Sequence, residues 1–179
     1  MESELVIDEG RRSDVEMLAE VLHAAVHAGA SVSFVLPFEM EEARAFWREK
    51  VLPGVEAGTR RLLTARRAGR IVGTVQLDLA TPPNQRHRAE VTKLLVHPEA
   101  RRQGIARALM LAIEEVARRE GRTLLTLDTR TGDAAEPLYL AMGYVLAGVI
   151  PRYARGPAST EFEAASFLYK ELVTPDASR

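Results

Sequence analysis

The sequence contains no cysteine, and this absence removes several kinds of chemistry at once. Without thiols, the chain can form no disulfide, no thiolate metal site and no cysteine-bound acyl intermediate. It also has little net charge, because 24 Lys and Arg residues nearly balance 25 Asp and Glu residues. A balanced charge gives no support for a general nucleic-acid or membrane surface. We therefore expect neither nucleic acid nor membrane among its partners.

Long apolar runs are missing as well. No run approaches the length of a membrane span, and residues 1–10 are acidic and lack the apolar core of a signal peptide. These features predict a cytoplasmic protein, and the absence of cysteine fits a reducing compartment. A chain of 179 residues can bury its own core. We expect one domain over residues 1–173 and a disordered tail over residues 174–179.

Short apolar strands and amphipathic helices follow one another along the chain. Apolar runs bounded by turn residues predict seven strands, at residues 5–7, 60–66, 70–79, 89–96, 123–129, 144–150 and 162–172. Apolar residues at helical spacing predict four helices, at residues 13–29, 40–53, 104–120 and 134–142. The second helix is expected to end near Pro53-Gly54. The expected fold class is therefore α/β (α+β), with a mixed sheet flanked by helices.

The segment from Leu94 to Arg107 is the most informative. An apolar strand leads into a loop with Arg101 and Arg102, and Gly104 stands where an amphipathic helix begins. The start of a helix carries unpaired N–H groups and partial positive charge, which bind a diphosphate. A glycine there leaves room for phosphates. The pattern is neither a P-loop nor a dinucleotide fingerprint, and an ordinary basic loop before a helix would look the same.

Residues 101–106, Arg-Arg-Gln-Gly-Ile-Ala, resemble the coenzyme A motif of the GNAT superfamily of N-acetyltransferases, Arg/Gln-x-x-Gly-x-Gly/Ala. Residues 135–144, with an aromatic pair around a helix end and a glycine, are similar to the second motif of that family. The resemblance implies a twisted, mostly antiparallel sheet whose fourth and fifth strands splay apart around acetyl-CoA, with no metal. The residues implied to contact acetyl-CoA are Leu94, Leu95, Val96, Arg101, Arg102, Gln103, Gly104, Ile105, Ala106 and Arg107.

Four further segments resemble the tabtoxin-resistance acetyltransferases: residues 29–34, 88–91, 127–129 and 167–170. Members of that group acetylate a small amino-acid-like toxin, so the resemblance implies toxin or antibiotic resistance. The family often has an asparagine at the position of Gly132 in this chain. Any cofactor contact made through that asparagine is therefore not carried over.

An acetyltransferase needs a base near its acceptor, because an alkyl amine with a pKa of ~10.4 is protonated at neutral pH. Glu90 is the first candidate. Strand alternation predicts that it shares a face with Leu94 and Val96, and the resemblance places a catalytic glutamate near the start of this strand. The alternative is a surface carboxylate paired with Arg88 or Lys93.

Asp128 is a second candidate base. It interrupts an apolar and threonine-containing strand near its carboxyl end, where open α/β sheets bind ligands. It could instead cap the helix that follows. Tyr139 resembles the family tyrosine that gives a proton to the departing thiolate, and its alternative role is that of a core aromatic residue.

Two other groups of residues are candidates for binding roles. Ser31, Ser33 and Phe34 belong to an unusually apolar connector that is predicted to form a wall of the substrate site, or else a plain interhelical loop. His23 and His27 have metal-ligand spacing on a helix, but no glutamate follows His23 as in metalloproteases. We expect two histidines at the edge of the core and no metal.

These observations predict direct transfer of an acetyl group from acetyl-CoA to the primary amine of a small molecule in a ternary complex. Two alternatives stay open: acetylation of a protein lysine or N-terminus, and a non-catalytic acyl-CoA-binding sensor. The sequence leaves monomer and homodimer equally open.

Overall fold

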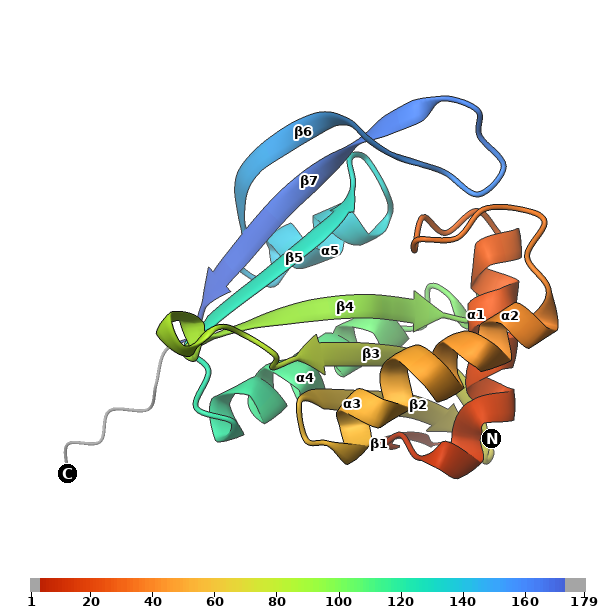
Figure 1. Ribbon diagram of the computed structural model, residues 1–179, viewed down its shortest axis with the longest axis horizontal. Coiled ribbons are helices and arrows are strands. Elements are labelled where there is room, and N and C mark those ends of the chain that lie inside the picture. The colour runs from red at the N-terminus through yellow and green to blue at the C-terminus, as the bar shows by residue number, and fades with distance from the viewer. Residues whose placement is uncertain (1–3, 173–179) are drawn as a thin grey trace.

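The computed structural model describes residues 4–172, which form a seven-stranded sheet with helices on both faces (Figure 1). The predicted tail at residues 174–179 lies outside this range. The sheet order is β1-β2-β3-β4-β5-β7-β6, and only the β4–β5 pair is parallel. This confirms the mixed, mostly antiparallel sheet. The strands are β1 (Leu5–Glu9), β2 (Arg60–Arg67), β3 (Arg70–Asp78), β4 (Arg88–Val96), β5 (Leu124–Arg130), β6 (Val145–Arg155) and β7 (Phe162–Glu171).

The helices are α1 (Val15–His27), α2 (Met40–Ala45), α3 (Leu52–Glu56), α4 (Ile105–Arg119) and α5 (Ala135–Ala141), with short 3-10 turns at Arg12–Asp14, Pro83–Gln85 and Pro98–Ala100. A π-helical segment, Phe46–Val51, joins α2 to α3. None of the helices in the described part of the chain is both long enough and apolar enough to cross a membrane.

The prediction that the second helix ends near Pro53 is wrong, since the helical path continues to Glu56. The π-helical segment explains why proline is tolerated. The Leu52 N–H donates to the Trp47 carbonyl, five residues earlier, and Pro53 then occupies the first turn of α3. A residue in the first turn needs no N–H donor, so the proline costs little there.

Two apolar clusters hold the helices to opposite faces of the sheet. α4 packs on one face through Ile105, Leu109 and Ile113, while α1 and the α2–α3 segment pack on the other around Trp47. Each of these four side chains is at most 2% exposed. Burying an aliphatic side chain of this size stabilises a fold by ~1.5–3 kcal/mol. The two clusters therefore fix the sheet between its helices.

β4 and β5 pair over only three residues, from Arg88 opposite Leu124 to Glu90 opposite Thr126. Beyond Glu90 the strands diverge, as Figure 1 shows, and β5 pairs instead with β7 along its whole length. This confirms the predicted splay. The divergence leaves backbone and side chains of β4 facing an opening in the middle of the sheet.

A bulge interrupts β4 just beyond this point. Thr92 lies opposite Gln76, but Leu95 lies opposite Thr74, so β4 holds one more residue than β3 between these pairs. Lys93 takes a left-handed backbone conformation with φ of +52°. A bulge of this kind reverses the alternation of side chains beyond it.

β6 forms one edge of the sheet and is longer than predicted, because it runs through Pro151 to Arg155. Its pairing with β7 shifts register between Ile150 and Ala154. Proline removes a ladder donor, and an edge strand with a register shift is where that loss is tolerated.

Candidate active site

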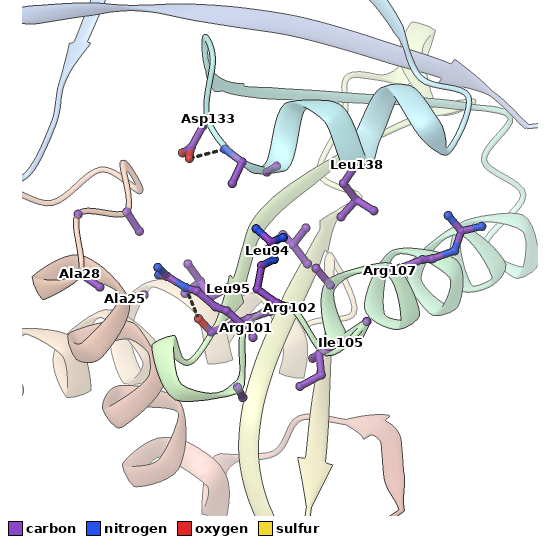
Figure 2. Close-up of a pocket in the computed structure, with 18 of the residues that line it drawn as sticks. Ala25, Ala28, Leu94, Leu95, Arg101, Arg102, Ile105, Arg107, Asp133 and Leu138 are labelled. Carbon is purple, nitrogen blue, oxygen red and sulfur yellow. Dashed lines mark hydrogen bonds between the residues drawn. The ribbon is translucent and has the colours of Figure 1, made fainter.

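A cavity of about 520 Å³ lies between the end of β4 and the β5–α5 segment, and Figure 2 shows many of its lining side chains. The end of α1 and the loop leading into α4 form its other walls. Nine of the ten residues predicted to contact acetyl-CoA line it: Leu94, Leu95, Val96, Arg101, Arg102, Gly104, Ile105, Ala106 and Arg107. Residues from four separate segments therefore meet at one cavity.

Gln103 is the tenth residue, and its side chain is engaged elsewhere. Its amide oxygen accepts from Arg67, and its Nε2 lies 3.4 Å from the Glu99 carbonyl. These bonds hold the loop to β2. The side chain of Gln103 therefore braces the loop, and Gln103 could serve a ligand only through its backbone.

The start of α4 has the features of a phosphate-binding helix terminus. Gly104 precedes the helix with φ of +77°, and no side chain caps the first turn. A Cβ added at Gly104 would meet no atom within 4 Å, so the space beside this residue, where the helix begins, is open. These N–H groups and the positive end of the helix dipole suit a diphosphate.

Three arginines surround this terminus: Arg101, Arg102 and Arg107. Figure 2 shows Arg102 extending toward Leu138, Arg101 extending toward the end of α1 near Ala28, and Arg107 pointing away from the other two. Arg101 makes a long bond of 3.5 Å from Nε to the Val96 carbonyl. Within residues 4–172, none of the three forms an ion pair with a carboxylate. Their positive charge is therefore available to an anionic ligand.

The two candidate bases lie on one face of the sheet at the splay. Glu90 is the last β4 residue paired with β5, and Asp128 follows two residues after its partner Thr126. Burial raises the pKa of the Glu90 carboxyl, and the nearby negative charge of Asp128 raises it further. Two neighbouring carboxylates whose charges interact suit both the binding of an ammonium group and the removal of its proton.

The alternative roles of these two acids find no support in the geometry. Among the described residues Glu90 forms no ion pair, because Arg88 donates to Gln85 and Thr126 instead. The start of α5 is bonded by Asp133, whose Oδ1 accepts from the Ala134 N–H at 2.7 Å. Asp128 therefore does not cap that helix.

The predicted alternation along β4 is wrong beyond Thr92. Leu94 and Val96 pack toward the α4 cluster, whereas Leu95 packs toward the α1 cluster, on the Glu90 side. The bulge at Lys93 causes this change, because its extra residue reverses which side chains face each way. Glu90 and the Leu94 and Val96 side chains therefore lie on opposite faces.

Lys93 is a further candidate site residue, which the sequence prediction considered only as an ion-pair partner. Its Nζ donates to Ser33 Oγ at 3.0 Å, and its pKa is lowered by burial. A lysine inside a mainly apolar strand was the available signal. Arg60 lies on the same face, paired with Asp78 at 2.7 Å and bonded to Gln76.

The predicted substrate wall divides into two parts. Ser33 reaches the β4 bulge through its bond from Lys93, whereas Phe34 packs on Phe38 and Phe46 with ring centroids 4.5 and 5.3 Å away. Ser31 is partly buried and is not among the residues that line the cavity. The structure therefore brings only Ser33 of the three into contact with a residue beside the candidate bases.

Tyr139 lies in the apolar cluster under α4 and α5, 6% exposed, with its ring centroid 5.8 Å from that of Tyr144. Its neighbour Leu138 lines the cavity, while Tyr139 itself is not among the lining residues. Burial, and then the charges of Asp133 and Asp128, raise the pKa of the Tyr139 phenol. Its proton is therefore retained at neutral pH, as a proton donor requires.

The two histidines of α1 stack on each other at 4.2 Å, and His27 Nε2 lies 2.9 Å from the Phe38 carbonyl. Within residues 4–172, no three His, Asp or Glu side chains gather in a way that could hold a metal ion. His23 also stacks near Phe38. Both rings thus take part in packing at the edge of the α1 cluster.

Comparison with known proteins identifies the family. The sequence model of the Acetyltransferase (GNAT) family matches residues 16–144. An uncharacterized N-acetyltransferase from Azospirillum brasilense is 34% identical over 134 residues, which cover 73% of this chain and 77% of that protein. N-acetyltransferase 8B from Rattus norvegicus is 32% identical over 131 residues, covering 65% of this chain and 59% of the rat protein.

Solved structures share the fold. A ribosomal-protein-alanine N-acetyltransferase from Brucella melitensis superposes with a TM-score of 0.77 at 22% identity, covering 93% of this chain and 99% of that one. A Salmonella typhimurium protein solved with its cofactor acetyl-CoA has a TM-score of 0.76 at 18% identity, with 98% of both chains covered. With the splayed sheet and the cavity at the start of α4, these matches show that the chain belongs to the GNAT family and is an acetyl-CoA-dependent N-acetyltransferase.

Proposed function

We propose that this enzyme transfers the acetyl group of acetyl-CoA to the primary amine of a small molecule, by direct attack in a ternary complex. The observation that carries the proposal is the pair of carboxylates, Glu90 and Asp128, on one face of the β4–β5 splay. This pair provides what a protonated amine needs before it can attack a thioester.

The size of the acceptor is inferred from the segments that border the sheet face carrying Glu90 and Asp128, here named the acid-bearing face. The connector between α1 and α2 and the loop between β6 and β7 approach each other across the opening (Figure 1). The Leu36 N–H donates to the Pro157 carbonyl at 2.9 Å, which joins these two segments. A bridge of this kind favours a small acceptor over a folded protein. The resemblance to tabtoxin-resistance acetyltransferases supports an amino-acid-like acceptor.

The end of β4 and the start of α4 would bind acetyl-CoA. Bound acetyl-CoA supplies the activated thioester carbonyl. The backbone of Leu94, Leu95 and Val96 would bind the pantetheine arm, and the first-turn N–H groups after Gly104 would bind the diphosphate with help from the loop arginines. Such N–H groups act without a reorganisation cost, because the helix already fixes them.

The protons are moved by the carboxylates and by Tyr139. Glu90, with its raised pKa, accepts a proton from the acceptor ammonium, directly or through water, and Asp128 stabilises the cation before that transfer. The amine nitrogen would then form its bond to the acetyl carbon as the carbon–sulfur bond breaks, and the departing sulfur would take up a proton from Tyr139. The nitrogen loses its second proton as the amide forms, and that proton would pass through water to restore the Tyr139 phenol.

The test is the release of free CoA thiol from acetyl-CoA with a panel of amino acids, polyamines, aminoglycosides and short peptides. The protein contains no cysteine, so it adds no thiol background. Turnover with a free amine in the panel supports the proposal. Turnover with peptides alone would replace it with a protein acceptor. Binding of acetyl-CoA by calorimetry without turnover on any acceptor would favour a sensor.

A further inference from the structure

Lys93 is a cation on the acid-bearing face, and within residues 4–172 no carboxylate forms an ion pair with it. Among the described residues its side chain has one recorded partner, the hydroxyl of Ser33 at 3.0 Å. The other cations of this face are occupied. Arg60 pairs with Asp78 at 2.7 Å, and Arg88 is held by Gln85 and Thr126. A partly buried ammonium with one hydroxyl partner keeps donors free for an anionic ligand.

The bulge in β4 is what places the Lys93 side chain on this face. In a regular strand, Lys93 would point away from the face that carries Thr92 and Glu90. The extra residue and the φ of +52° at Lys93 turn its side chain toward Ser33 of the α1–α2 connector. A non-glycine residue in this conformation carries a backbone cost, and such costs are concentrated at functional sites.

Lys93 has charged neighbours of both signs. Glu90 and Asp128 both interact with it electrostatically, raising its pKa against the lowering effects of burial and of Arg60. The same two acids face the splay where the acceptor ammonium is proposed to bind. One face thus presents two carboxylates and an ammonium that forms no ion pair within residues 4–172, which is complementary to a ligand that carries both a cation and an anion.

We propose that Lys93, positioned by Ser33, binds an anionic group of the acceptor, and so selects amines that carry a carboxylate near the reacting nitrogen, as α-amino acids do. This inference rests on the proposed function and adds to it the residue that discriminates between acceptors. No bond is made or broken at Lys93. The ion pair orients the acceptor so that its nitrogen faces Glu90.

The experiment compares matched acceptors in the purified enzyme: an α-amino acid, its carboxamide and the decarboxylated amine. The wild-type enzyme is expected to favour the acid in kcat/KM by ~10- to 100-fold, the range of a charge-assisted hydrogen bond. Lys93→Met should remove most of that preference, chiefly through KM for the acid, and leave the carboxamide within about threefold. Lys93→Arg should restore part of it.

Lys50→Met is the matched control, because Lys50 is exposed on the π-helical segment. It should leave the preference for the acid unchanged. Ser33→Ala removes the hydroxyl to which Lys93 donates and should weaken the preference by a smaller factor. Thermal unfolding and the Kd for acetyl-CoA, measured for each variant, identify any variant that has lost its fold.

Two outcomes overturn the inference while leaving the proposed function intact. One is a wild-type enzyme that acetylates the acid, the amide and the bare amine equally well. The other is a folded Lys93→Met enzyme whose kcat/KM falls by the same factor for all three acceptors, since that indicates a structural role. Absence of turnover with every small amine, with acetyl-CoA bound, would instead overturn the proposed function itself.

Discussion

The two ends of the β4–β5 opening are built in different ways. The end proposed to bind acetyl-CoA, here named the cofactor end, is largely local in sequence, because residues 94–107 supply a strand end, a loop and the first turn of α4. Most of its chemistry is carried by backbone N–H groups and by arginines in one loop. The end proposed to bind the amine, here named the acceptor end, is assembled from distant segments, with Glu90 on β4, Asp128 on β5 and Ser33 in the α1–α2 connector.

This difference indicates which amino-acid substitutions each end should tolerate. Backbone groups are fixed by φ and ψ, so the cofactor end depends on conformation and net charge more than on any one side chain. The acceptor end depends on individual side chains whose protonation states are set by their neighbours. Substitutions at the acceptor end should therefore alter turnover and specificity, and those at the cofactor end should alter the affinity for acetyl-CoA.

The largest expected effect is at Glu90. Glu90→Gln keeps the shape and removes the base, so kcat at neutral pH should fall by ~10²–10⁴, the range for a general base. The Kd for acetyl-CoA should not change. Steady-state kinetics and calorimetry measure both quantities, with Glu115→Gln as a control on the exposed side of α4. Unchanged turnover at saturating acceptor would remove Glu90 from this role.

A substitution at Tyr139 tests whether a residue buried in the apolar cluster also affects turnover. Tyr139→Phe keeps the ring that packs on Tyr144 and removes only the phenolic proton. We expect kcat to fall by about 10²-fold, with little change in the affinity for acetyl-CoA or in Tm. A drop in Tm with turnover preserved would show that Tyr139 acts only in packing.

Gly104 tests the role of backbone conformation at the cofactor end. Gly104→Ala either holds alanine at φ of +77°, which costs ~1–2 kcal/mol of folding stability, or shifts the backbone at the start of α4. Such a shift would displace the N–H groups proposed to bind the diphosphate. The Kd for acetyl-CoA should rise by about 10-fold. Gly121→Ala is the control, since Gly121 lies beyond the other end of α4 with φ of +69° and equally open surroundings. It should lower Tm similarly and leave the Kd unchanged, and an equal rise in Kd would contradict the assignment.

A smaller effect is expected at the loop arginines. Arg102→Gln should raise the Kd for acetyl-CoA by roughly 5-fold, about 1 kcal/mol, because one of several positive charges is lost. The ratio to wild type should shrink as salt is added, since screening weakens the contact in both enzymes. Arg119→Gln, at the far end of α4, should have no such effect. A ratio independent of salt would argue against a charge contact.

The smallest expected effect is a shift in the pH dependence of kcat/KM, which tests whether Glu90 is the base. The pKa of Glu90 is raised by burial, Asp128 and Asp78, and lowered by Arg88 and Lys93. The carboxylate is the active form, so the rate should fall as pH drops through this raised pKa. Asp128→Asn removes a negative charge and lowers the pKa of Glu90, which moves the acidic limb to lower pH.

Arg88→Gln provides a control of opposite sign. Arg88 lowers the pKa of Glu90, so its removal should raise that pKa and move the acidic limb to higher pH. Shifts in the same direction for both variants would show that the limb reports another group. A limb that neither variant moves would indicate that Glu90 does not control the pH profile.

The sequence by itself predicted the order of strands and helices along the chain, and the cavity-lining residues between Leu94 and Arg107, because these depend on local patterns. Apolar periodicity identifies elements, and a glycine after two arginines marks the start of α4. The helical path past Pro53 was missed, because the π-helical segment before it depends on packing around the buried Trp47.

Only the tertiary structure decided how the acceptor end is arranged. Alternation along β4 predicted the wrong face for Leu94 and Val96, because the bulge arises from the register of β4 against β3, a relation between two strands. The same bulge turns Lys93 toward Ser33, sixty residues earlier in the chain. Local sequence sets the period of a strand, but the register of its neighbour decides which residues face the substrate.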